Sequence, residues 1–210
     1  MKPILLSYVL GPLENNTYVL ADPVSRAAVV IDPSYESHIL LENIHAQGLR
    51  LEQVWLTHAH FDHIAGVSEV CSSAEPALPV ALHPADLDLY QRGGGAAEFG
   101  MTFEPAPAPQ VLLADGQELW VGGVAVKVLH APGHTPGHVI FYCGAAGAAL
   151  VGDVIFLGSV GRTDLSGGSH SQLMASIRKQ VLTLPPETVL YCGHGPETNV
   201  ADEAATNPYL

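Results

Sequence analysis

The sequence has 210 residues, of which 14% are charged, and it carries a formal net charge of −13. An acidic chain repels the phosphates of nucleic acids and of anionic membranes, so we expect neither as a partner. Frequent Gly (21) and Pro (16), with an odd number of cysteines (3) and no CxxC motif, indicate a turn-rich cytoplasmic protein of one domain, 1–210.

Apolar runs in the first third of the chain predict strands at 4–10, 17–21, 27–32 and 51–57. A helix is expected at 35–47, because its apolar residues share one face and Gly48 provides a stop. A second helix is expected to begin near Asp62 and to end near Ser73.

The middle of the chain is less regular. A strand is predicted at 80–83 and a helix at 84–92, with Pro84 in its first turn. Residues 93–110, "GGGAAEFGMTFEPAPAPQ", form a long predicted loop. Loops of that length in compact domains often cover a functional site, and an insertion without such a role is the alternative.

The last half returns to strands, which are predicted at 117–123, 124–131, 138–143, 148–156 and 188–192. A helix is expected at 169–184, and a polar tail completes the chain. Two runs of mostly buried strands, each followed by a helix, predict an α/β fold of two packed sheets covered by helices.

Three histidines and an aspartate crowd one short segment, "HAHFDH" at 58–63, directly after a predicted strand. Histidines this close would crowd one another without a shared purpose, so the segment predicts a metal site. His134, Asp153 and His194 also follow predicted strands and can converge on the same edge of the sheets. Imidazole and carboxylate are ligands that suit zinc and iron.

The other histidines lack such neighbours in the sequence. We interpret His38, His45, His83 and His170 as surface or packing residues. His130 and His138 flank the His134 motif, where an ordinary strand position is one interpretation and orientation of a metal ligand is the other.

The motifs "THAHFDH", "PGHTPGH", "LVGDVIF" and "YCGHGPET" resemble those of the metallo-β-lactamase fold superfamily, in the same order. "GSVGRTDLSGGS" and the C-terminal tail are similar to its glyoxalase II-like (hydroxyacylglutathione hydrolase-like) branch. This resemblance implies an αββα sandwich with a site for two divalent ions. Zinc is the expected metal, and iron and manganese are the alternatives. It assigns one ion to His58, His60 and His134, the other to Asp62, His63 and His194, and Asp153 to both.

The resemblance also implies a reaction. Two ions roughly 3.5–4 Å apart can hold a bridging water and lower its pKa, which gives a hydroxide nucleophile. A thioester such as S-lactoylglutathione suits this attack, because its leaving thiol has a pKa of about 8.5 and needs little acid help. Asp62 and Asp153 are the candidate catalytic residues, and Asp32 and Thr57 are candidate partners of the ligands, with a helix or turn cap as the alternative for Asp32.

Arg162 matches the basic residue that binds the glycine carboxylate of glutathione in that branch, so we expect it to bind substrate; a surface salt bridge is the alternative. The sequence departs from the pattern of that branch at Asp164 and Pro196, where the branch has aromatic residues. Two-domain members of the branch complete the glutathione site with a C-terminal helical domain, and we expect residues 93–110 to cover the site in its place. The alternatives left open are a persulfide dioxygenase with a single iron, a lactonase, and a metal-binding protein without catalytic activity.

Overall fold

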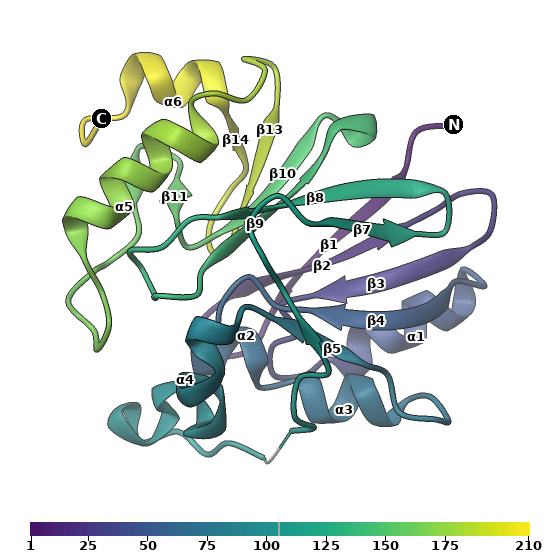
Figure 1. The fold of residues 1–210 in the computed structure, drawn as a ribbon. Coiled ribbons are helices and arrows are strands. Elements are labelled where there is room, and N and C mark those ends of the chain that lie inside the picture. The colour runs from purple at the N-terminus through teal and green to yellow at the C-terminus, as the bar shows by residue number, and fades with distance from the viewer. Residues whose placement is uncertain (105) are drawn as a thin grey trace.

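Two six-stranded sheets pack face to face at the centre of the protein (Figure 1). The computed structural model describes residues 1–104 and 106–210, so Pro105 of the predicted loop lies outside the described residues. The first sheet has the order β1-β2-β3-β4-β5-β6. Its strands are Ile4–Leu10 (β1), Asn15–Ala21 (β2), Ala27–Ile31 (β3), Arg50–Trp55 (β4), Val80–Leu82 (β5) and Val111–Leu112 (β6).

The second sheet has the order β14-β13-β10-β9-β8-β7. Its strands are Glu118–Val121 (β7), Val124–His130 (β8), Val139–Cys143 (β9), Ala148–Gly152 (β10), Val189–Cys192 (β13) and Thr198–Asn199 (β14). A separate hairpin pairs Ile155–Phe156 (β11) with Ser159–Val160 (β12).

Helices cover the outer face of each sheet, so the predicted αββα sandwich is confirmed (Figure 1). The helices are His38–Ala46 (α1), Phe61–Ile64 (α2), Val67–Ser72 (α3), Leu87–Gln91 (α4), His170–Ser176 (α5) and Val200–Thr206 (α6). Three 3₁₀ segments are Pro84–Asp86 (η1), Gly93–Phe99 (η2) and Gly144–Ala146 (η3), and a π-helical segment is Ile177–Val181 (η4). None of the helices in the described ranges is long and apolar enough to cross a membrane.

Apolar side chains fill the space between the sheets and the space under each helical layer. Trp55 and Phe141 meet between the two sheets with ring centroids 5.3 Å apart, and both are fully buried. Burying a side chain such as Phe141 contributes about 1.5–3 kcal/mol relative to exposure. Strands buried on both faces explain why the sequence shows continuous apolar runs instead of alternation.

Some predicted elements differ from the structure. The helix expected at 62–73 is broken into α2 and α3 at Gly66, whose N–H donates to the Pro33 carbonyl at 2.9 Å outside the helix; the backbone there lies so close to the Ser34 carbonyl that only glycine fits. The loop expected at 93–110 begins instead with the turns of η2, which three glycines with positive φ, Gly93, Gly94 and Gly95, allow. The tail contains β14 and α6, which begins after a side-chain cap from Asn199 to the Asp202 N–H.

Candidate metal centre

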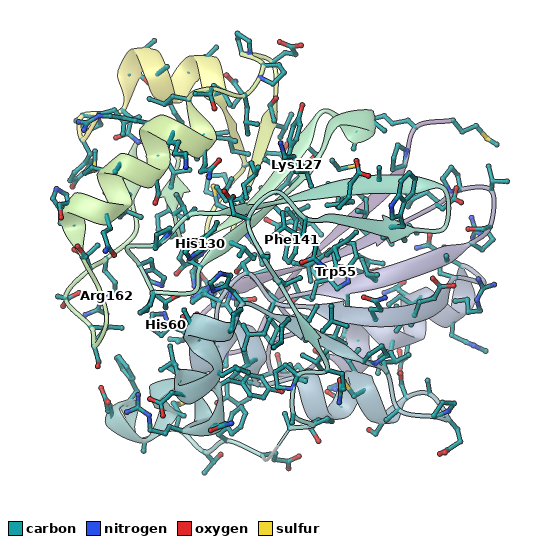
Figure 2. All side chains as sticks on the ribbon, in the orientation of Figure 1. Trp55, His60, Lys127, His130, Phe141 and Arg162 are labelled. Carbon is teal, nitrogen blue, oxygen red and sulfur yellow. The ribbon has the colours of Figure 1, made fainter. Side chains whose placement is uncertain are left out.

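The parallel strands of both sheets end at one edge, and the predicted ligands lie there. β3 and β4 run parallel, as do β10 and β13. His58 and His60 follow β4, Asp153 follows β10 and His194 follows β13. Figure 2 shows His60 and Arg162 on the same side of the molecule.

The remaining predicted ligands come from two other elements. α2 carries Asp62 and His63, and the loop between β8 and β9 carries His134. A hydrogen bond of 2.8 Å from the Val139 N–H of β9 to the Thr57 carbonyl joins the edges of the two sheets. The structure therefore brings together every residue that the sequence analysis assigned to the metals.

The ligand atoms form two adjacent groups of three. His58, His60 and His134 offer atoms that all lie within 4.8 Å of one another, and so do Asp62, His63 and His194. Within the first group, His60 Nδ1 lies 2.8 Å from His134 Nε2. Within the second group, His194 Nε2 lies 3.1 Å from Asp62 Oδ2.

Asp153 lies between the two groups. Its Oδ1 is 3.4 Å from His63 Nε2, and its Oδ2 is 3.5 Å from His134 Nε2 and 3.8 Å from His194 Nε2. One carboxylate therefore faces ligands of both groups, as a bridging position requires.

Backbone carbonyls fix the orientation of two histidine rings. His134 Nδ1 donates to the Arg162 carbonyl at 2.8 Å, and His194 Nδ1 donates to the Leu13 carbonyl at 3.1 Å. Because a carbonyl oxygen only accepts, each ring carries a proton on Nδ1 and turns Nε2 toward the centre.

Asp32 and Thr57 orient two further rings. Asp32 Oδ2 accepts from His63 Nδ1 at 2.9 Å and from the Thr57 hydroxyl at 2.6 Å. Since that hydroxyl donates to Asp32, it accepts from His58 Nδ1, which lies 3.0 Å away. Asp32 therefore acts as a partner of the ligands, not as the helix cap that was the alternative interpretation.

Several inward-facing atoms have no hydrogen-bond partner. His58 Nε2, His63 Nε2 and Asp153 Oδ1 are buried and unpaired among the described residues. A buried polar atom without a partner costs about 1–3 kcal/mol, so this arrangement is unfavourable without a ligand. Neutral imidazole nitrogens and carboxylates directed at a common space fit divalent metal ions.

The two groups differ in their electrostatics. Burial, reinforced by neighbouring imidazoles, holds the pKa of His58 well below its usual value and lowers the pKa of His60 to about 3. Burial would also lower the pKa of His63 and His194, but the nearby carboxylates outweigh it and raise both pKa values. Burial opposes ionisation of Asp153, yet the surrounding imidazoles, His63 foremost, hold its pKa far below the usual range.

A cavity of about 350 Å³ opens beside the centre. Its wall combines ligands with apolar and polar side chains, including Leu13, Phe61, Leu89, Glu98, Phe99, Arg162, Leu165 and Ser166. Gly94, Gly95, Glu98 and Phe99 come from η2, so the first part of the segment 93–110 does border the site.

Arg162 lies at the cavity wall and forms the salt bridge that was the alternative interpretation. It lines the cavity, and its guanidinium also forms two bonds of 2.8 Å with the carboxylate of Asp164. The Asp164 pKa falls to about 2 because of its hydrogen bond with Arg162. The pair is exposed to solvent, which limits its strength.

Three histidines outside the predicted ligands, His83, His130 and His138, stack on other imidazole rings. Orientation of a metal ligand was one of the two interpretations for His130 and His138. His138 stacks on His58 with an interplanar angle of 17°, and its Nε2 accepts the Asp153 N–H at 3.1 Å. His83 stacks on His130 with ring centroids 4.1 Å apart. The sequence places His138 shortly after His134 and directly before β9, which was the available signal for a role at the metal centre. The contacts that define this role are made across the sheet and are not visible in the sequence.

Comparison with known proteins identifies the scaffold. A family model described as the metallo-beta-lactamase superfamily matches residues 10–194. The chain is 38% identical over 205 residues to a probable metallo-hydrolase, YqgX, of Bacillus subtilis, with 96% of this chain and 94% of that protein covered. It is 32% identical over 199 residues to the hydroxyacylglutathione hydrolase GloC of Haemophilus influenzae, covering 94% and 93%.

Solved structures give the same result. The BLEG-1 B3 metallo-beta-lactamase superposes with a TM-score of 0.92 at 35% identity, covering 99% of each chain. TTHA1623 in a di-iron-bound form superposes with a TM-score of 0.89 at 41% identity, covering 98% of this chain and all (100%) of that one.

Proposed function

The chain belongs to the metallo-beta-lactamase superfamily, and on that premise we propose that it is a binuclear metallohydrolase that cleaves thioesters. S-lactoylglutathione, or a related acyl thioester, is the proposed substrate. The observation that carries this proposal is the pair of adjacent ligand groups with Asp153 between them. A centre for a single ion would need only one of these groups.

The proposed ligands are those of the two groups. His58, His60 and His134 would hold one divalent ion, Asp62, His63 and His194 the other, and Asp153 would contact both. Bound there, two such ions, zinc in our proposal, would supply an activated water molecule and Lewis-acid polarisation of the substrate carbonyl. The di-iron-bound form of the similar protein TTHA1623 supports two ions and keeps iron as the alternative metal.

The protein's own residues contribute orientation and charge. Asp32 and the Leu13 and Arg162 carbonyls hold ring protons on the outer nitrogens, which leaves the inner nitrogens free. Asp62, only 7% exposed beside the cavity, is placed to orient the attacking water or to accept its proton. The departing thiolate needs little acid help, because thiols ionise near pH 8.5.

The cavity provides the binding surface for the substrate. Leu13, Phe61 and Phe99 offer apolar contact to the bound substrate. Arg162 provides a positive charge for a carboxylate of the thiol part, in competition with Asp164. The name of the relative GloC supports a glutathione thioester. We place the reaction in the cytoplasm, which suits the buried thiols of Cys71, Cys143 and Cys192.

A turnover screen with quantified metals tests this proposal. Purified protein is assayed with S-lactoylglutathione, other thioesters, lactones and glutathione persulfide side by side, and its metal content is measured. We expect two ions per chain, thioester hydrolysis, and no activity after His60→Ala, whereas His45→Ala on the exposed surface serves as the matched control. One iron per chain with uptake of oxygen in the presence of glutathione persulfide would replace the hydrolase with a dioxygenase.

A further inference from the structure

Asp86 is a fully buried carboxylate that connects two ligand-bearing loops. Its Oδ2 accepts the Ala59 N–H at 3.1 Å and the Thr135 hydroxyl at 2.7 Å. Its Oδ1 accepts the Gly137 N–H at 2.6 Å. Ala59 lies between His58 and His60, and Thr135 directly follows His134.

The contact between Asp86 and the second loop is close on both sides. A Cβ atom on Gly137 would lie 2.7 Å from Asp86 Oδ1, so only a glycine admits the carboxylate at this distance. Burying a carboxylate is costly unless hydrogen bonds compensate it, and here all of its bonds come from the two ligand loops. The hydrogen bonds that compensate for the burial of this carboxylate therefore also fix the two loops relative to each other.

The segment that follows Asp86 also approaches the metal centre. Residues 87–99 form α4 and η2, which line the cavity with Leu89, Glu98 and Phe99. At Gly94 this segment packs on the backbone of Phe61, where a side chain would collide. Asp86 thus anchors the start of the cavity wall to the loop that carries the ligands.

We propose that Asp86 is a positioning residue for the ion held by His58, His60 and His134. Its hydrogen bonds set the separation of the loop 58–60 from the loop that follows β8, and with it the 2.8 Å approach of His60 Nδ1 to His134 Nε2. The inference rests on the proposed function in one respect, the assignment of these histidines to a metal ion. It concerns no group of the second ion site.

Asp86→Asn tests the proposal, because an amide keeps the shape but replaces one accepting oxygen with a donor that faces N–H or O–H groups. Metal affinity is measured by competition with a chromophoric chelator, and ligand geometry by the visible spectrum of the cobalt(II) protein. Loss of such an outer partner typically costs 10–100-fold in metal affinity. We expect that loss, with an altered cobalt spectrum, for one of the two ions, while the other keeps its affinity.

Asp88→Asn is the matched control. Asp88 lies two residues away on the exposed side of α4, where its carboxylate pairs with Arg92 at 2.7 Å. This variant removes the same charge without touching the ligand loops. We expect wild-type affinity for both ions and an unchanged cobalt spectrum.

Thr135→Val removes only one of the hydrogen bonds to Asp86 and decides the matter if Asp86→Asn does not fold. A several-fold loss of affinity for one ion is expected, and wild-type affinity in this variant or in folded Asp86→Asn overturns the inference. Wild-type protein that binds fewer than two ions would instead refute the proposed binuclear site. The two failures are thus distinguishable before any activity is measured.

Discussion

Asp32→Asn should weaken metal binding, most directly at the site of His63, while leaving the fold intact. Asp32 Oδ1 accepts the Thr57 N–H at 2.7 Å, and Oδ2 accepts from the Thr57 hydroxyl and from His63 Nδ1. An asparagine that keeps the first bond presents its NH₂ group to the other two donors. His63 then has to move its proton to Nε2, which faces Asp62 and Asp153, and the nitrogen meant for the metal is blocked.

The size of the effect follows from these bonds. Two lost bonds to a charged acceptor cost roughly 3 kcal/mol of stability in the metal-free protein. Metal affinity at the site of His63 should fall 10–100-fold, as expected for an outer partner, which is about 1.4–2.7 kcal/mol. Chelator competition measures the affinity, and urea unfolding of the chelated protein measures the stability.

Asp22→Asn supplies the control for the loss of a buried carboxylate elsewhere. Asp22 is 6% exposed and accepts bonds from Val24, Ser25 and Gly123, remote from the metal centre. We expect it to lower stability without any change in metal affinity. Two ions bound at wild-type affinity by Asp32→Asn would refute the reasoning about the His63 proton.

The remaining predictions concern substrate binding and pH. Arg162→Ala should raise KM for S-lactoylglutathione with little change in kcat. Asp164→Asn should lower KM, because it frees the guanidinium that now bonds to the Asp164 carboxylate at 2.8 Å. An unchanged KM in both variants would show that Arg162 does not bind the substrate. Phe99→Ala opens the η2 wall of the cavity and should raise KM for thioesters several-fold, as steady-state kinetics would show. The His83 pKa is lowered to about 4 by burial and a neighbouring imidazole, so the unfolded chain, with a pKa of about 6.5, binds protons more readily than the folded one. The contribution of His83 to the free energy of unfolding is therefore fully kept above pH 6.5 and declines as pH falls toward 4. His83→Asn should reduce this decline when urea unfolding is compared at pH 7 and pH 5. An equal decline in both proteins would contradict the role given to His83.

The sequence predicts that the candidate ligands converge because their signal is local. His58, His60, Asp62 and His63 stand within one short segment, and the strands before Asp153 and His194 are continuous apolar runs. Parallel strands then bring their carboxyl ends to one edge, whatever the detail of the loops. The resemblance to a known family added the division of the ligands between two ions.

Asp86 was not predicted as part of the centre, and His138 was left between a strand position and the orientation of a metal ligand, because their contacts exist only after folding. Asp86 bonds to Ala59 and Gly137, which lie 27 and 51 residues away. Its sequence context, "HPADL", is that of an ordinary helix start. The break at Gly66 escaped prediction for the same reason, since its N–H bonds to the carbonyl of Pro33, which is distant in the sequence.

Removal of the metals should destabilise the protein by a predictable amount. The unpaired inward atoms of His58, His63 and Asp153 gain partners only when ions are bound, so the ions bind the folded chain and not the unfolded one. Free metal at a hundredfold excess over Kd adds about 2.7 kcal/mol per ion. For a chain of this length each kcal/mol shifts Tm by about 2–4 °C, so one ion is worth roughly 5–11 °C.

Thermal unfolding before chelation, after chelation and after reloading measures this shift. His60→Ala should retain part of it, because it leaves the group of Asp62, His63 and His194 complete. A wild-type Tm that does not respond to chelation or reloading, in protein shown to bind two ions, would mean that the metals bind the unfolded chain equally well. The centre would then not be preorganised by Leu13, Asp32 and Arg162, and the hydrogen bonds that fix the ring nitrogens would have no energetic consequence.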